Sequence, residues 1–404
     1  MNRSSDLRAW WAHRQGLLGE LQGLDASGVL TSAGWARSIG GVNPYLTLFS
    51  RAAVSREQAD RAAEDLRIYE LPAARGCTYV LPHTEFAIGL KVGETFGSAE
   101  MQVARKLGVT DLEIDRLCKA VLAALASGPT DPAALRTAVG DTARSLGEEG
   151  KKKGLTTTLP VALGRLQATG KILRKPVNGR FDVQRYAYTL WPDGPCGNTG
   201  LTTDEAFDAL ARRYFKWIGP ATPANFAWFT GLPKGSVKTI LDGLPLTPIE
   251  PGAELLILSE DLDEFKGFKP PMDPVYRLVG GLDALFLLRR EVRPHLADED
   301  LVRQVPTSKG TATSGSVQDL SNNAIVDRGR IVGLWEYDFD RSEIAWHSFV
   351  PRDQALKDEV SRTEAFVRDQ LGDARTLSLD SPQSRRPMID ALRAAAAAES
   401  HPTG

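Results

Sequence analysis

The chain has 404 residues, of which 42% are hydrophobic and 25% are charged, and its formal net charge is −2. This composition is typical of globular proteins and excludes disordered, fibrous and disulfide-stapled chains. No apolar stretch approaches the ~20 residues of a membrane helix, and the first residues lack a secretory signal. We therefore expect a cytoplasmic protein that binds no membrane.

The N-terminal region, residues 1–105, combines helical and extended patterns. Residues 8–11 and 56–71 are predicted to be helical, and residues 77–81 are predicted to form a strand. We interpret this region as a divergent winged-helix unit.

Residues 106–197 show the order helix, helix, helix, strand, turn, strand. The first helix carries one apolar stripe from Ile114 to Leu125, with side chains at the i, i+3, i+4 and i+7 spacing of an amphipathic helix. A further helix is predicted at residues 155–168, and the dipeptide Asn178-Gly179, favoured in tight hairpin turns, separates two predicted strands. This order predicts a basic winged-helix unit.

A short internal sequence repeat, the echo, links this unit to the next one. Residues 128–135 (GPTDPAAL) return as residues 219–226 (GPATPANF), and in each copy a capping residue and a proline begin a new helix. The helix before each copy opens with a threonine followed three residues later by a glutamate, which is the spacing of a capping box; these threonines are Thr110 and Thr202. We therefore predict a third winged-helix unit at residues 198–270.

The sequence changes character after residue 270. Residues 282–288 and 329–335 are predicted strands, and residues 388–399 are a predicted Ala-rich helix. We interpret residues 271–404 as a β-rich C-terminal region with a terminal helix. The predicted fold class is therefore α+β, with three tandem winged-helix units followed by a β-rich region.

The small net charge hides a basic segment. Residues 144–185 contain ten Lys or Arg against three acidic residues, a surplus of seven positive charges. Such a surplus fits phosphate contacts to DNA, and the alternative is a solvated charged surface. The residues of this segment that lie on the loop, helix and wing that a winged helix presents to DNA are Lys151, Lys152, Lys153, Arg165, Lys175 and Arg180.

Five collinear segments carry a resemblance to a known family. They are residues 44–51 (PYLTLFSR), 75–82 (RGCTYVLP), 212–228 (RRYFKWIGPATPANFAW), 282–285 (LDAL) and 327–333 (DRGRIVG). In this order they resemble the winged-helix DNA glycosylases of the AlkZ/YcaQ group, which excise bulky alkylpurines and unhook interstrand crosslinks.

The resemblance implies three winged helices around a concave channel of the size of DNA. It also implies a double-stranded DNA partner, a nucleoid-associated location and a protein that acts as a monomer without a metal or cofactor. The histidines form no metal-ligand spacing, which agrees with that expectation. Two residues that belong to or follow the family segments, Arg51 and His83, join the residues expected to contact DNA, although His83 could equally be a cap.

The resemblance puts the family's catalytic pair, Gln-x-Gln or Gln-x-Asp, near Arg37 and Ile39, but this sequence has no Gln or carboxylate between Asp25 and Arg51. Hydrolysis of an N-glycosidic bond needs a group that orients or deprotonates a water. The candidate catalytic residues of the segment are Asn43, Arg37 and Tyr45. The carboxamide of Asn43 could hold a water, but Asn-Pro is also an ordinary turn, and Arg37 could instead contact phosphate or lie solvated.

Two functions follow from these observations. The first is a monofunctional DNA glycosylase that acts on bulky alkylated bases or crosslinks. The second is a non-catalytic DNA-binding or regulatory relative that has lost the chemistry. The missing pair favours the second, and the resemblance along the whole chain favours the first.

Overall fold

The computed structural model describes residues 3–96, 99–183, 185–192, 194–195, 200–307 and 310–400. The chain is 50% helical and 17% strand, and this mixture confirms the α+β class. Within these described ranges no helix is long and apolar enough to cross a membrane.

The N-terminal region surrounds a small antiparallel sheet. The strand order is β1-β3-β2, with Ala36 paired to Val80 and Val80 paired to Glu70. The elements are α1 (Arg3–Arg14), α2 (Ala26–Ala33), β1 (Ala36–Arg37), α3 (Asn43–Ala52), α4 (Arg56–Glu64), β2 (Ile68–Pro72), β3 (Thr78–Pro82), α5 (Phe86–Glu94) and α6 (Ala99–Lys106).

The predicted helix at residues 56–71 is wrong in its second half. Helix α4 ends at Glu64, and Leu66 then adopts a positive φ of 55°. A left-handed residue cannot continue an α-helix, so the chain turns there and enters strand β2. The predicted strand at residues 77–81 is confirmed as β3.

The middle region, residues 111–190, has an apolar core of its own, built from side chains between Ala104 and Ile172. Thr110 caps its first helix by accepting a hydrogen bond from the N–H of Glu113. Its elements are α7 (Asp111–Leu125), α8 (Pro132–Val139), α9 (Gly147–Lys152), α10 (Leu159–Ala168), β4 (Ile172–Pro176) and β5 (Tyr186–Leu190).

The following region begins with the full capping box of Thr202 and Glu205. The echo correctly predicts a new helix at Pro132 and at Pro223, each after a residue whose side chain caps it. The elements are α11 (Thr203–Ile218), α12 (Pro223–Thr230), α13 (Lys234–Asp242), β6 (Leu246–Pro248) and β7 (Leu256–Leu258).

One topology occurs three times along the chain. In each copy a helix is followed by a short extended segment, further helices and a hairpin. The extended segment pairs with the second strand of the hairpin: β1 with β3, Thr130 with Tyr188 of β5, and Ala221 with Leu256 of β7. The echo at residues 128 and 219 is therefore part of a larger repeat that also includes the N-terminal region.

The C-terminal region contains a four-stranded antiparallel sheet of order β13-β12-β11-β8 and a separate hairpin of β9 and β10. Its elements are α14 (Leu262–Gly267), β8 (Tyr276–Val279), α15 (Ala284–Leu287), β9 (Gln304–Thr307), β10 (Gly310–Thr313), β11 (Asn323–Asp327), β12 (Arg330–Asp338), β13 (Glu343–Ser348), α16 (Gln354–Phe366) and α17 (Pro382–Ser400).

The strand predicted at residues 282–288 is wrong, because this segment forms the short helix α15. Asp283 accepts a hydrogen bond from the N–H of Leu285 and caps that helix, as expected of an N-cap aspartate. The strand predicted at residues 329–335 lies within β12, and the predicted terminal helix lies within α17.

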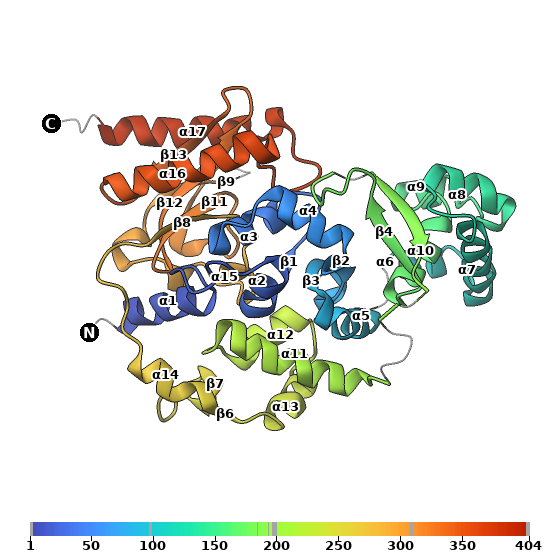
Figure 1. Ribbon diagram of the computed structural model, residues 1–404, viewed down its shortest axis with the longest axis horizontal. Helices are drawn as coiled ribbons and strands as arrows, with labels where there is room; N and C mark the ends of the chain where they lie inside the picture. Colours follow the sequence, from blue (N-terminus) through green and yellow to red (C-terminus); the bar gives the residue numbers. More distant parts are fainter. Residues whose placement is uncertain are drawn as a thin grey trace.

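Two apolar clusters join the N-terminal and C-terminal regions. Strand β12 contributes Leu334 to one cluster and Trp335 to the other, so both faces of its sheet are covered. Phe49 of α3 stacks on Phe366 of α16 with ring centroids 3.9 Å apart. Figure 1 shows the middle region, α7 to α10, at one end of the molecule, with the loop of its β4–β5 hairpin reaching back to α4.

Candidate nucleic-acid interface and active site

The end of β1 and the loop after it contain Arg37 and Ile39, the residues near which the family's catalytic pair is expected. Arg37 donates from its guanidinium to the carbonyl of Thr78 at 2.7 Å and lies over the ring of Tyr79. Ser38 donates its backbone N–H to the same carbonyl at 3.0 Å. The loop is therefore fixed against strand β3.

A C-terminal segment, residues 375–378, lies directly against this loop. The N–H of Val42 donates to the carbonyl of Arg375 at 3.0 Å, and the N–H of Ser378 donates to the carbonyl of Ile39 at 3.1 Å. Gly41 packs so closely that a Cβ there would lie 2.0 Å from the carbonyl oxygen of Thr376. Residues 39–42 are thus covered by the chain itself.

Asn43 is buried, with 3% of its surface exposed. Its Nδ2 donates to the carbonyl of Arg37 at 2.9 Å, and its Oδ1 lies against Gly280 without a hydrogen-bond partner. This position contradicts the expectation that Asn43 orients a water, because the carboxamide faces the protein interior and not a cleft.

Tyr45 is also buried and has a structural role. Its hydroxyl donates to Asp60 at 2.5 Å and accepts from the N–H of Phe181 at 3.0 Å. Burial, reinforced by the charge of Asp60, raises the pKa of Tyr45 well above its usual value. A hydroxyl that is enclosed and neutral in this way has no access to substrate, which corrects its expected catalytic role.

The loop of the β4–β5 hairpin does not project from the protein. Phe181 is 1% exposed and packs on Tyr45. The guanidinium of Arg180 forms a bidentate ion pair with Asp182 and also donates to the carbonyl of Leu371 at 2.9 Å. This corrects the expectation that Arg180 contacts DNA at a wing tip, because its donors are used within the protein.

Arg51 is fully buried and forms a bidentate ion pair with Asp283. The expectation that it contacts DNA is therefore wrong. The segments around these two residues both carried the family resemblance, and the ion pair shows that they pack together.

The remaining predicted DNA contacts lie at the surface. Lys151 and Lys152 are on helix α9, which was expected to be a loop, and their side chains are 68% and 71% exposed. Arg165 on α10 is half exposed and pairs with Asp115 at 2.8 Å. The other exposed residues of this set are Lys153, Lys175 and His83.

The basic segment is partly neutralised within the protein. In the described part of residues 144–185, six of the basic residues pair with carboxylates, namely Arg144, Lys151, Lys152, Arg165, Arg174 and Arg180. Three of the partners, Glu113, Asp115 and Glu70, come from outside the segment. The net positive charge that this segment can offer to DNA is therefore smaller than the sequence count implies.

A cleft of about 820 Å³ opens between the β2–β3 hairpin and helix α10. Its volume lies within the range of about 300–1,000 Å³ typical of ligand pockets. Glu70, Thr78, Arg165 and Arg174 contribute to its wall. Glu70 also accepts a hydrogen bond from the hydroxyl of Ser38 at 2.5 Å, so the cleft wall is bonded to the loop that follows β1.

Glu70 is not among the site residues predicted from the sequence. The signal that could have identified it is a single carboxylate inside the run Ile68-Tyr69-Glu70-Leu71, where a buried strand should be apolar.

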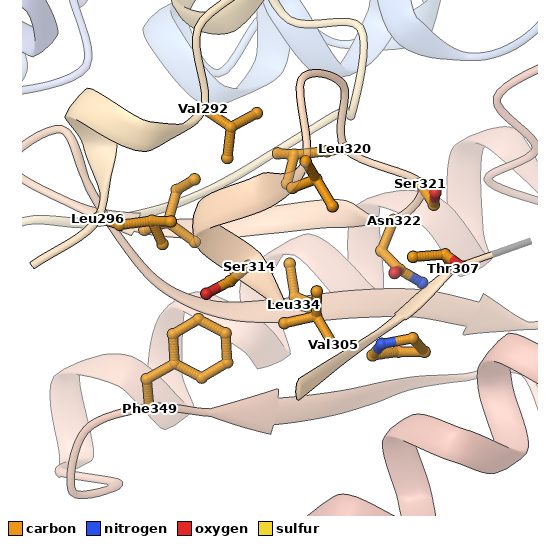
Figure 2. Close-up of a pocket in the computed structure, with 13 residues that line it drawn as sticks. Val292, Leu296, Val305, Thr307, Ser314, Leu320, Ser321, Asn322, Leu334 and Phe349 are labelled. Atoms are coloured by element: carbon orange, nitrogen blue, oxygen red, sulfur yellow. The ribbon is translucent and has the colours of Figure 1, made fainter. Parts of the chain in front are cut away.

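A second cavity is too small to hold a substrate. The cavity in Figure 2, lined by Leu296, Val305, Leu334 and Phe349 among others, has a volume of about 10 Å³. This volume suits about one water molecule and no nucleotide. Among the described residues no cluster of His, Cys, Asp or Glu could hold a metal ion.

The comparison with known families identifies the relationship. The family described as DNA glycosylase AlkZ-like matches residues 39–373. The chain belongs to the AlkZ-like DNA glycosylase family. A solved structure of the Streptomyces sahachiroi DNA glycosylase AlkZ has a TM-score of 0.68 and 23% sequence identity to this chain, and the match covers 92% of this chain and 98% of that protein. At this identity the likeness shows a shared fold. A search of curated proteins gave no match.

Proposed function

We propose that this AlkZ-like protein is a monofunctional DNA glycosylase that excises bulky alkylated bases from duplex DNA and unhooks crosslinks. The observation that carries the proposal is the cleft beside the β1 loop. Two of its wall residues, Glu70 and Thr78, bind Ser38, which lies between the positions of the family's catalytic pair. An extruded nucleotide in this cleft would lie next to that loop.

The three repeats support a DNA-binding architecture. Their shared order and strand pairing are those of winged-helix units, so we interpret residues 1–105, 106–197 and 198–270 as three such units. The exposed cations of α9, α10 and β4 would contact phosphates. The residues proposed to make these contacts are Lys151, Lys152, Lys153, Arg165 and Lys175, together with His83 of the N-terminal unit.

The chemistry favours bases that already leave easily. An alkylated purine carries a positive charge, and loss of the base neutralises it, so modest assistance to the attacking water suffices. No metal or cofactor enters this scheme, and the protein would act as a monomer in the cytoplasm on the nucleoid.

A non-catalytic DNA-binding relative is the second candidate. The observation that favours it is the covering of residues 39–42 by residues 375–378, together with Arg37 and Ile39 at the positions of the pair.

The two functions are separated by incubating the protein with duplex DNA that contains one 7-methylguanine or one nitrogen-mustard crosslink. Alkaline cleavage then reveals abasic sites, and fluorescence anisotropy measures binding to the same duplex. Excision supports the glycosylase, binding without excision supports the non-catalytic relative, and absence of binding at low salt contradicts both.

A further inference from the structure

We infer that Glu70 on strand β2 is the catalytic carboxylate that orients the attacking water in this protein. The inference rests on the proposed glycosylase function and names the residue that performs it. Between Asp25 and Arg51 the chain has no carboxylate, so the loop after β1 cannot supply one itself. Strand β2 brings Glu70 to that loop from outside the segment.

The register of the sheet brings Glu70 next to the loop after β1. Glu70 is opposite Val80 of the central strand β3, and Val80 is opposite Ala36 of β1. Residues two apart on a strand share a face, so Glu70 lies on the same face as Ser38. The hydroxyl of Ser38 donates to its Oε1 at 2.5 Å.

The other carboxylate oxygen of Glu70 is held by the guanidinium of Arg174 on β4. Arg174 is itself fixed, because its guanidinium lies 4.1 Å from the ring of Tyr186 and its carbonyl accepts the hydroxyl of Tyr69. The carboxylate is therefore oriented before any substrate arrives, and preorganised charge of this kind contributes most to catalysis.

Glu70 retains the capacity to bind a water. An ionised carboxylate offers about four lone-pair sites, and Ser38 and Arg174 occupy two of them. Glu70 is 4% exposed and is one of the residues that line the cleft. A water bound on this side would face a sugar placed in the cleft.

The reaction is a hydrolysis in which water is the only co-reactant. The water oxygen forms a bond to C1′ of the deoxyribose, and the bond from C1′ to the base nitrogen breaks. The electron pair of that bond stays on the base and neutralises its positive charge. The proton of the water passes to the carboxylate of Glu70 and from there to solvent.

The ion pair of Glu70 and Arg174 also joins the N-terminal region to the β4–β5 hairpin, so the test must separate catalysis from structure. Glu70→Gln keeps the shape and one acceptor but removes the charge, whereas Glu70→Asp keeps the charge and shortens the side chain. A structural role predicts that any loss of rate in Glu70→Gln comes with losses of stability and DNA affinity, because Arg174 loses its charged partner. A catalytic role predicts a rate that falls at unchanged DNA affinity, with Glu70→Asp faster than Glu70→Gln because it keeps the charge.

Glu85 provides the matched control. It is 2% exposed and accepts hydrogen bonds from the guanidinium of Arg213 at 2.8 Å and from Trp35 at 2.5 Å, but it does not line the cleft. Glu85→Gln therefore removes a comparably buried, arginine-paired charge away from the proposed reaction.

The measurement is the single-turnover rate of 7-methylguanine excision at saturating protein, with DNA affinity and urea unfolding of each variant. We expect Glu70→Gln to lower the rate by about 100-fold at unchanged affinity, the range of general acid–base groups. Glu70→Asp should retain more activity than Glu70→Gln, and Glu85→Gln should excise at the parent rate. Should Glu70→Gln not fold, Glu70→Asp is compared with Glu85→Asp, and a rate loss confined to the former supports the inference.

A Glu70→Gln variant that excises within about threefold of the parent rate overturns this inference and leaves the glycosylase proposal standing. The same holds if Glu70→Asp is slower than Glu70→Gln. A parent protein that excises nothing overturns both.

Discussion

Arg51 and Asp283 form a bidentate ion pair at full burial, with guanidinium-to-carboxylate distances of 2.8 and 2.7 Å. The pair joins α3 to the start of α15, and Gln15 of the segment after α1 accepts a further hydrogen bond from Arg51 at 3.0 Å. Three segments that are distant in sequence are therefore connected at one buried charge.

Removal of one partner from this pair should strongly destabilise the protein, since it leaves the other charge buried and unpaired. We expect Arg51→Met or Asp283→Asn to lower the free energy of unfolding by about 3–5 kcal/mol in urea titrations. The control is Arg61→Met, which breaks the exposed pair with Glu57 on α4 and should cost less than about 1 kcal/mol. Equal losses in the two cases would contradict the account of the buried pair.

Tyr45→Phe should loosen the attachment of the β4–β5 loop. The change leaves the N–H of Phe181 buried without its acceptor, and it should lower the free energy of unfolding by about 1–3 kcal/mol. Hydrogen exchange measured by mass spectrometry should become faster at residues 177–183. Tyr276→Phe removes a comparable hydroxyl-to-carboxylate bond, that to Asp353 at 3.0 Å, and should leave exchange at residues 177–183 unchanged. If both variants change it alike, the loop is not held by Tyr45.

DNA affinity should depend on three lysines, two at the end of α9 and one directly after it. Lys151 and Lys152 pair with neighbouring glutamates at high exposure, and such pairs compete poorly with phosphate. Replacement of Lys151, Lys152 and Lys153 by Ala should weaken binding equally on different DNA sequences and reduce the salt slope by up to ~3. Lys357→Ala on α16 serves as the control. Unchanged binding of the triple variant would place the DNA surface elsewhere.

Glu336 on β12 should make stability depend on pH. Burial raises the pKa of Glu336 to about 8, against the opposing effects of Arg385 and of the hydrogen bond from Asn322. The unfolded chain loses this proton near the ordinary pKa of 4.5. The stabilising contribution is therefore complete below pH 4.5 and is lost as the pH rises through 8.

Between these values the parent should lose up to about 1.4 kcal/mol per pH unit from this group. Urea unfolding at pH 5, 6.5 and 8 measures the slope, and Glu336→Gln should flatten it. A variant with the same pH dependence as the parent would show that Glu336 is not protonated in the folded protein.

Local signals in the sequence predicted the helical parts of the fold well. The caps at Thr110, Thr202 and Thr222 act through neighbouring backbone N–H groups, and such contacts are encoded within three residues. The prediction of a strand at residues 282–288 was wrong. The apolar run of this segment fits a strand or a buried helix equally, and the cap of Asp283 decided between them.

The candidate site could be predicted only in part, because it depends on contacts between distant segments. The expected wing tip at Arg180 is folded back by Phe181 against Tyr45, 136 positions earlier in the chain. Glu70 reaches Ser38 across the central strand, and its partner Arg174 comes from another repeat. Neither local periodicity nor charge counting contains such pairings.

The proposed glycosylase would hydrolyse the bond between an alkylated base and its sugar. Mass-spectrometric detection of free 7-methylguanine, after excess protein is incubated with a duplex that contains this base, tests this activity without relying on abasic-site cleavage. We predict release of the free base in a yield equal to the abasic sites revealed by alkali, with no strand cleavage before alkali. A duplex that is bound by the protein but keeps all of its 7-methylguanine would contradict the claim.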